Sequence, residues 1–298
     1  MGYASSRAAL GAGFMWTVSS PGPAILIAVV QTTVFLPWAF GAAWLTDDFL
    51  ARSIEADRFL RSIDVVLLAD LIKTQALGFH AWLVTLAAGA LVFIGTSTFL
   101  TGGLIATAMA PRPSVRFFFT EAGRAWPRLL WLLGVTVPLF GAAVVLPAVV
   151  VFGAADAWAM DCCSEGASIA IRVCAALLIM IDAALILAAI DAMKIQCVRA
   201  PEDSLLRIVR AALRAVWISP LRALALYLPY PCVLFGAVLV WAWVDVRIPR
   251  SGWMLCLIGF AWQQIGAVLR SALRSAWIAA EVFYWGPRLV GPGRTSEG

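Results

Sequence analysis

From residue 77 to residue 110 the chain carries no Asp, Glu, Lys or Arg side chain. A helix rises about 1.5 Å per residue, so a helix of this length would be longer than the roughly 30 Å hydrocarbon layer of a bilayer is thick. The run therefore predicts a transmembrane helix. The rest of the chain must then form a fold that can surround such a helix in lipid.

The composition extends this conclusion to the whole chain. Of its 298 residues, 62% are hydrophobic and only 13% are charged, whereas a soluble domain is about half apolar and a quarter charged. Too few polar side chains remain to cover a surface that faces water. We therefore expect residues 1–298 to form a single helical membrane domain, with an ordered core from about residue 20 to residue 285.

Six segments of the sequence are long and apolar enough to be spans. They are residues 24–45, 77–110, 129–154, 167–197, 223–244 and 252–284. The charged stretch 47–73 is predicted to lie at the membrane surface instead. The predicted fold class is all-α: a polytopic membrane protein with about six transmembrane helices and several amphipathic interfacial helices.

Two short amphipathic helices are predicted between prolines. The first begins after Ser114, which can cap it, and ends at Pro127. The second ends at Pro220 and places Leu206, Val209, Leu213 and Val216 on one face. Both helices carry arginines on the opposite face, where anionic lipid head groups attract them. The predicted head-group contacts are Arg116, Arg124, Arg207, Arg210 and Arg214.

Basic residues near the spans predict the orientation. With a cytoplasmic amino terminus, the inner segments hold 15 of the 22 basic residues, and the outer segments hold seven basic and ten acidic residues. Basic positions are almost all Arg, which indicates a bacterial source of high GC content. The first 20 residues hold one basic residue and no apolar core, so we expect no cleavable signal peptide. The predicted location is the bacterial inner membrane, with both termini in the cytoplasm.

The fourth predicted span contains two carboxylates. Asp182 lies near its middle, where an ionisable group is costly unless it is paired. It is either a proton- or ion-coupling group or a carboxylate that joins helices, and the second reading is favoured. Asp191 can pair with Lys194 one turn later. At 100° per residue, Asp182 and Asp191 point in opposite directions.

A polar stripe follows the sixth predicted span, where Gln263, Arg270, Arg274 and Glu281 share one helical face. Such a stripe must face the bundle, a cavity or a partner while it is in hydrocarbon. We therefore predict a polar seam between the fourth and sixth helices, as a structural joint rather than a transport path. Its predicted members are Asp182, Asp191, Lys194, Gln263, Arg270 and Arg274.

No pattern of enzyme chemistry is present. His80 is the only histidine, and it has no cluster of cysteines or carboxylates in its sequence neighbourhood from which a zinc site could be built. The sequence lacks a phosphate-binding glycine loop, a zinc-protease motif and a nucleophile elbow. We therefore expect no catalytic residues, no metal and no cofactor. The basic residues flank apolar runs, so nucleic acid is not expected as a partner either.

The layout resembles poorly characterised bacterial multi-pass families. They include the membrane domain attached to some glycerophosphodiester phosphodiesterases and the YciC-type inner-membrane proteins. The resemblance rests on Gly102-Gly103-Leu104, on the Phe117-Phe118-Phe119 run, on Asp191-x-x-Lys194 and on the stretch from Gln263-Gln264 to Arg274. It spans roughly residues 20–285 and implies a helical membrane domain of unassigned function. No phosphodiesterase activity is implied.

Two functions remain open from the sequence. The first is a non-enzymatic membrane or scaffold component, with lipids and a protein partner or a second copy as its contacts. The alternative is a transporter or permease subunit that moves a small or lipidic solute through the seam. A transporter needs a polar cavity lined by several helices, whereas a scaffold can be packed solid.

Overall fold

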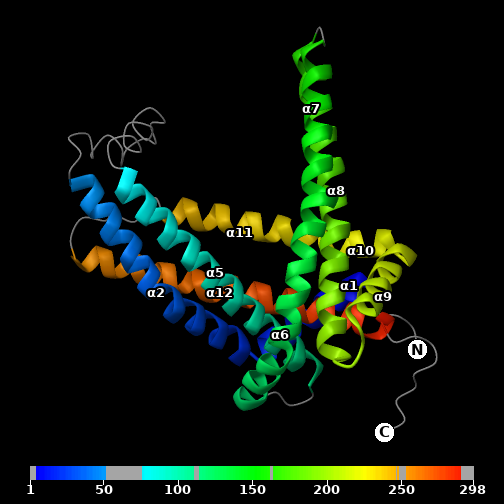
Figure 1. Cartoon of the computed structure of the whole chain (residues 1–298), viewed down its shortest axis with the longest axis horizontal. Helices are drawn as coiled ribbons and strands as arrows, with labels where there is room; N and C mark the ends of the chain where they lie inside the picture. Colours follow the sequence, from blue (N-terminus) through cyan, green and yellow to red (C-terminus); the bar gives the residue numbers. More distant parts are fainter. Residues whose placement is uncertain are drawn as a thin grey trace. The chain divides into compact units, whose positions relative to one another are not determined.

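The computed structural model describes residues 5–51, 76–110, 114–161, 164–245, 247 and 253–289. Every regular element in these ranges is a helix, and none is a strand (Figure 1). The prediction of an all-α chain is confirmed. The prediction for the charged stretch 47–73 falls, beyond residue 51, outside the described residues.

Four helical stretches of the described chain are long and apolar enough to cross a bilayer. They are Leu83–Met109, Val115–Met160, Glu165–Arg199 and Pro220–Val244. A fifth would combine α1 (Ser6–Ser19) with the start of α2 (Gly22–Ala51), which meet at an angle of 75°. α1 was not predicted from the sequence.

The last helix, α12 (Trp253–Leu289), is not among these four. Two adjacent glutamines, Gln263-Gln264, and the arginines at 270 and 274 interrupt its apolar run. Its length is close to that of the sixth predicted span. The polar stripe that the sequence indicates thus lies on a long helix that is not among the four stretches apolar enough to cross a bilayer.

The chain forms two compact units, residues 26–98 and the remaining residues on either side of that segment. In the smaller unit, α2 and α5 (Ala76–Met109) meet at Gly89. A Cβ atom built there would lie 3.5 Å from the indole of Trp38, which is ordinary contact distance. The absent side chain at this position lets the two helices approach closely.

The larger unit contains one helical stretch that includes three prolines, Pro127, Pro138 and Pro147. It consists of α6 (Val115–Phe140), the π-helical segment η1 (Gly141–Val145) and α7 (Leu146–Met160). The prediction that a short helix ends at Pro127 and a separate span begins at residue 129 is therefore wrong. A proline removes one backbone hydrogen bond, whereas the buried face of α6 at Ala122, Ala125 and Leu129 continues across it.

α8 (Glu165–Arg199) returns along α7, and the two helices lie side by side (Figure 1). The side chain of Ser164 caps α8 by accepting a hydrogen bond from the amide of Ala167. After a turn follow α9 (Leu205–Ile218), α10 (Pro220–Tyr227) and α11 (Pro229–Asp245). The predicted proline boundary at Pro220 is confirmed.

Small residues allow the closest helix contacts in the larger unit. α1 packs along α12, and a Cβ at Gly13 would lie 2.8 Å from the Cβ of Ala280. A Cβ at Gly103 of α5 would lie 2.8 Å from the ring of Phe118, which is buried in α6. The Gly102-Gly103 pair thus lies at a close helix crossing.

Candidate ligand cavity

An ion pair on α8 forms the centre of the candidate site. Lys194 Nζ lies 2.7 Å from Asp191 Oδ1, and the two residues are one turn apart. The side chains are only 34% and 18% exposed. A partly buried pair is screened less by solvent than a surface pair, so each charge depends on the other for compensation.

The junction between α10 and α11 places two tyrosines beside this pair. The hydroxyl of Tyr227 donates to Asp191 Oδ2 at 3.2 Å. Pro229 starts α11 just after Tyr227, so Tyr230 follows on the next helix. Both rings contact Trp277 of α12. The ring of Tyr227 meets it edge-on, with 5.1 Å between the ring centroids, and the ring of Tyr230 stacks on it, with 4.5 Å between the centroids. These contacts fix the tyrosines against α12.

α12 contributes the second pair of charges. Arg274 donates to the Oγ1 atom of Thr101 on α5 at 2.8 Å. Glu281, two turns later on the same helix, is 3% exposed, and its Oε1 atom is buried without a hydrogen-bond partner among the described residues. Glu281 lines the same cavity as Asp191 and Tyr227. Carboxyl groups from α8 and from α12 therefore border one space.

These groups line a cavity of about 470 Å³ within the larger unit. The remaining lining is mostly apolar. The cavity is bounded by Thr101 and Ile105 of α5, by Met180, Ala183, Ala184, Leu187, Asp191 and Lys194 of α8, by Tyr227, Leu228, Tyr230 and Leu234 of the α10–α11 region, and by Arg274, Trp277, Ile278 and Glu281 of α12. Its volume lies in the range of about 300–1,000 Å³ that is usual for small-molecule sites.

The structure brings together only part of the predicted seam. Asp191, Lys194 and Arg274 line this cavity. Gln263 and Arg270 line a second cavity of about 240 Å³ between α11 and α12.

Asp182 lines neither cavity, and its Oδ2 atom is buried without a hydrogen-bond partner among the described residues. Asp182 and Asp191 are nine positions apart, which amounts to about two and a half helical turns and separates the two carboxylates.

Sequence reasoning did not identify Thr101, Tyr227 and Tyr230 as members of the site. The tyrosines flank Pro229, and a proline inside an apolar stretch indicates a bend that can turn polar side chains toward a neighbouring helix. Thr101 precedes the Gly102-Gly103 pair. Neither signal indicates which helix the side chain would meet.

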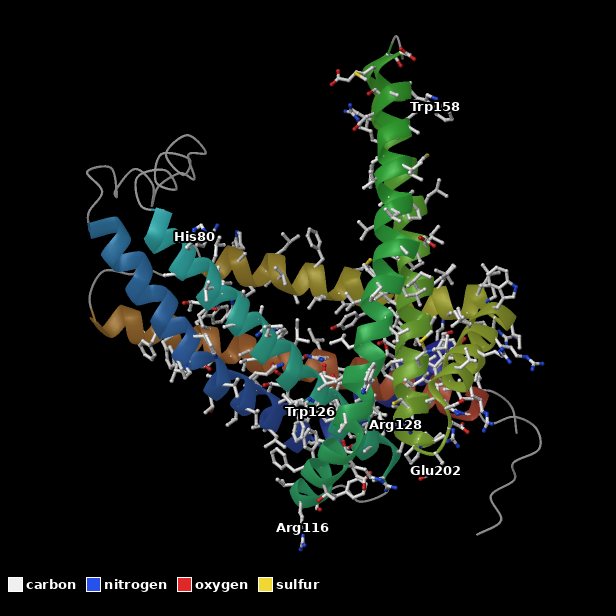
Figure 2. All side chains as sticks on the ribbon, viewed as in Figure 1. His80, Arg116, Trp126, Arg128, Trp158 and Glu202 are labelled. Atoms are coloured by element: carbon white, nitrogen blue, oxygen red, sulfur yellow. The ribbon has the colours of Figure 1, made fainter. Side chains whose placement is uncertain are left out.

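The five arginines predicted to contact head groups are all exposed, and Figure 2 shows Arg116 at the end of the larger unit opposite Trp158. The predicted apolar face of α9 is partly wrong. The structure buries Ile208, Ala212 and Val216. It leaves Leu206 and Leu213 exposed, and Trp217 is 87% exposed. α9 therefore carries a buried face, an exposed apolar stripe and, next to that stripe, its arginines.

A different arginine is structural. Arg128 of α6 donates hydrogen bonds to the backbone oxygens of Ala200, Pro201 and Asp203 in the turn between α8 and α9. Figure 2 shows Arg128 beside the turn that carries Glu202. Carbonyls at a helix end lack partners within the helix, so this guanidinium satisfies groups that would otherwise need water.

The described residues contain no group of three or more His, Cys, Asp or Glu side chains that could hold a metal ion. No family model, curated protein or solved structure matches the chain. The geometry of the cavity therefore carries the functional argument.

Proposed function

We propose that this chain is a multi-pass protein of the bacterial inner membrane that binds a small or lipidic solute in the charged cavity, as a transporter or permease subunit does. The observation that carries the proposal is the set of four ionisable side chains from α8 and α12 around a space of about 470 Å³. No chemical step is proposed, because the site presents no nucleophile activated by a base.

The free-energy cost of these charges supports a binding role. Ionisable side chains between apolar helices are expensive to desolvate. Replacing a buried ion pair by well-packed apolar residues of similar volume often leaves a protein just as stable, so stability alone does not explain such charges. A structural joint could close around its ionisable side chains and leave no volume. Here the Lys194–Asp191 ion pair, Arg274 and Glu281 line an open space instead, which favours the transporter over the scaffold that the sequence favours.

The proposal keeps six crossings with both ends in the cytoplasm: α2, α5, α6 to α7, α8, α10 to α11, and α12. Four of these pass the tests of length and composition. Figure 2 shows Arg116 and Glu202 at the end of the α7–α8 pair opposite Trp158. The basic segments around α6 and α9 therefore share one end, as the positive-inside rule requires of a cytoplasmic face.

Anionic lipids are the proposed partners of that face. On α9 the exposed Leu206, Leu213 and Trp217 lie beside Arg207, Arg210 and Arg214. An exposed apolar stripe next to a cationic stripe suits the boundary between acyl chains and head groups. Each arginine near an anionic leaflet contributes roughly 1 kcal/mol to membrane attraction.

Binding of amphiphiles to the purified full-length protein in nanodiscs tests the proposal. The probes are dodecanoate, dodecyltrimethylammonium and dodecanol, which share one tail and differ in the charge of the head. We expect at least one probe to bind saturably. The variant Ala183→Trp, which fills the cavity from α8, is expected to lower that affinity by about ten-fold or more, since it removes the space for the tail.

Ala176→Trp provides the matched control, because Ala176 lies two turns earlier on α8 and is exposed. It is expected to bind the probes as the unmodified protein does. If all three probes partition equally into nanodiscs that contain the unmodified protein, Ala183→Trp or no protein, the cavity is not a binding site. The scaffold function would then be the better account.

A further inference from the structure

The charges of the cavity indicate which head group it accepts. Lys194 and Arg274 each contribute one positive charge. Asp191 and Glu281 contribute two negative charges only if both are ionised. The net charge of the empty cavity is therefore decided by the two carboxyl groups.

The position of Glu281 indicates that its carboxyl group is neutral. Asp191 accepts hydrogen bonds from Lys194 and Tyr227. Glu281 is instead 3% exposed, its Oε1 atom is buried without a hydrogen-bond partner among the described residues, and none of the ion pairs seen there includes it. A carboxylate that is closed off from water and has no cation partner is costly, so Glu281 keeps its proton. The cavity then carries one net positive charge.

Arg274 is the cation that remains for a ligand. Lys194 forms an ion pair with Asp191 at 2.7 Å, whereas Arg274 donates to the neutral hydroxyl of Thr101. A guanidinium has five N–H donors in a planar fork that matches a carboxylate or a phosphate. Arg274 therefore retains donors for an acidic head group.

The rest of the cavity suits an apolar tail. Met180 and Leu187 of α8, Leu234 of α11 and Ile278 of α12 line it. A ligand with an acid at one end and a hydrocarbon tail at the other would compensate the positive charge and bury its tail against these side chains.

We infer that the cavity binds an amphiphile whose head carries a single negative charge, and that this head is held by Arg274. The inference rests on the proposed function and names the substrate class of that same site. The solute enters as an anion, and the protonated Glu281 keeps the site from binding amines, because an ammonium group would meet the excess of positive charge.

The three probes in nanodiscs at neutral pH test the inference. Dodecanoate is expected to bind at least about ten-fold more tightly than dodecyltrimethylammonium, because it gains charge-assisted hydrogen bonds to Arg274. Arg274→Gln is expected to remove this preference and to leave dodecanol affinity unchanged. Arg274→Lys keeps the positive charge and is expected to retain part of the preference for dodecanoate.

Glu281→Gln tests the neutral state of Glu281. Glutamine has nearly the size of a protonated glutamate and adds no charge, so the preference for dodecanoate over dodecyltrimethylammonium is expected to persist in this variant. Tighter binding of dodecyltrimethylammonium than of dodecanoate, lost in Glu281→Gln, would overturn the inference and leave the proposed function standing. Failure of every probe to bind would instead remove the proposed function.

Discussion

At the scale of single residues, Arg128 shows how one side chain can determine where two helices meet. Its guanidinium serves three backbone oxygens at the α8–α9 turn, and no lysine could reach all three because an ammonium lacks the planar fork. We predict that Arg128→Lys lowers the stability of the protein by about 1–3 kcal/mol, since buried carbonyls lose their donors. A lower melting temperature in detergent would show this loss.

Arg124→Lys is the control for this substitution, because Arg124 lies one turn earlier on α6 and is exposed. Arg124→Lys is expected to change the free energy of unfolding by no more than about 0.5 kcal/mol. Equal melting temperatures for the two variants would show that the three carbonyls have other donors.

At the scale of elements, the contact between α1 and α12 depends on Gly13. A Cβ there would lie inside contact distance of the Ala276 carbonyl oxygen, which belongs to backbone that cannot rotate away. We predict that Gly13→Val separates α1 from α12 and costs about 1–3 kcal/mol. Amide hydrogen exchange of residues 6–19 measures the separation directly, and faster exchange is expected.

Gly11→Val places the same side chain on the same helix, where nothing lies within 4 Å of the added Cβ. It controls for the helix propensity of valine, and its exchange rates are expected to match those of the unmodified protein. Protection of α1 that is equal in both variants would contradict the packing seen at Gly13.

At the scale of the whole molecule, the distribution of basic residues predicts the topology. We expect green fluorescent protein fused after residue 298 to fluoresce, because this reporter folds in the cytoplasm. Alkaline phosphatase fused after Met160, at the end of α7, is expected to be active because the proposed topology places that end in the periplasm. Active phosphatase at residue 298 would reverse the orientation or change the number of crossings.

Much of this protein was readable from local patterns. Helical structure follows from apolar runs in lipid, where each backbone group needs a partner inside its own helix. Ser114 caps α6 by accepting from the amide of Phe117, as its place before an amphipathic run indicates. The Gly102-Gly103 pair marks a close helix crossing for the same local reason, since it removes the side chains that would keep helices apart.

The sequence by itself therefore determined the all-α class, most of the long helices and the predicted polar stripe on α12. Only the tertiary structure decided that Asp191 contacts Tyr227 and shares a cavity with Glu281, that Asp182 lies outside this cavity, and that α6 continues through Pro127. The first set depends on interactions within one helix and with the surrounding solvent. The second depends on which helix faces place side chains far apart in sequence next to each other, and no spacing along the chain encodes that choice.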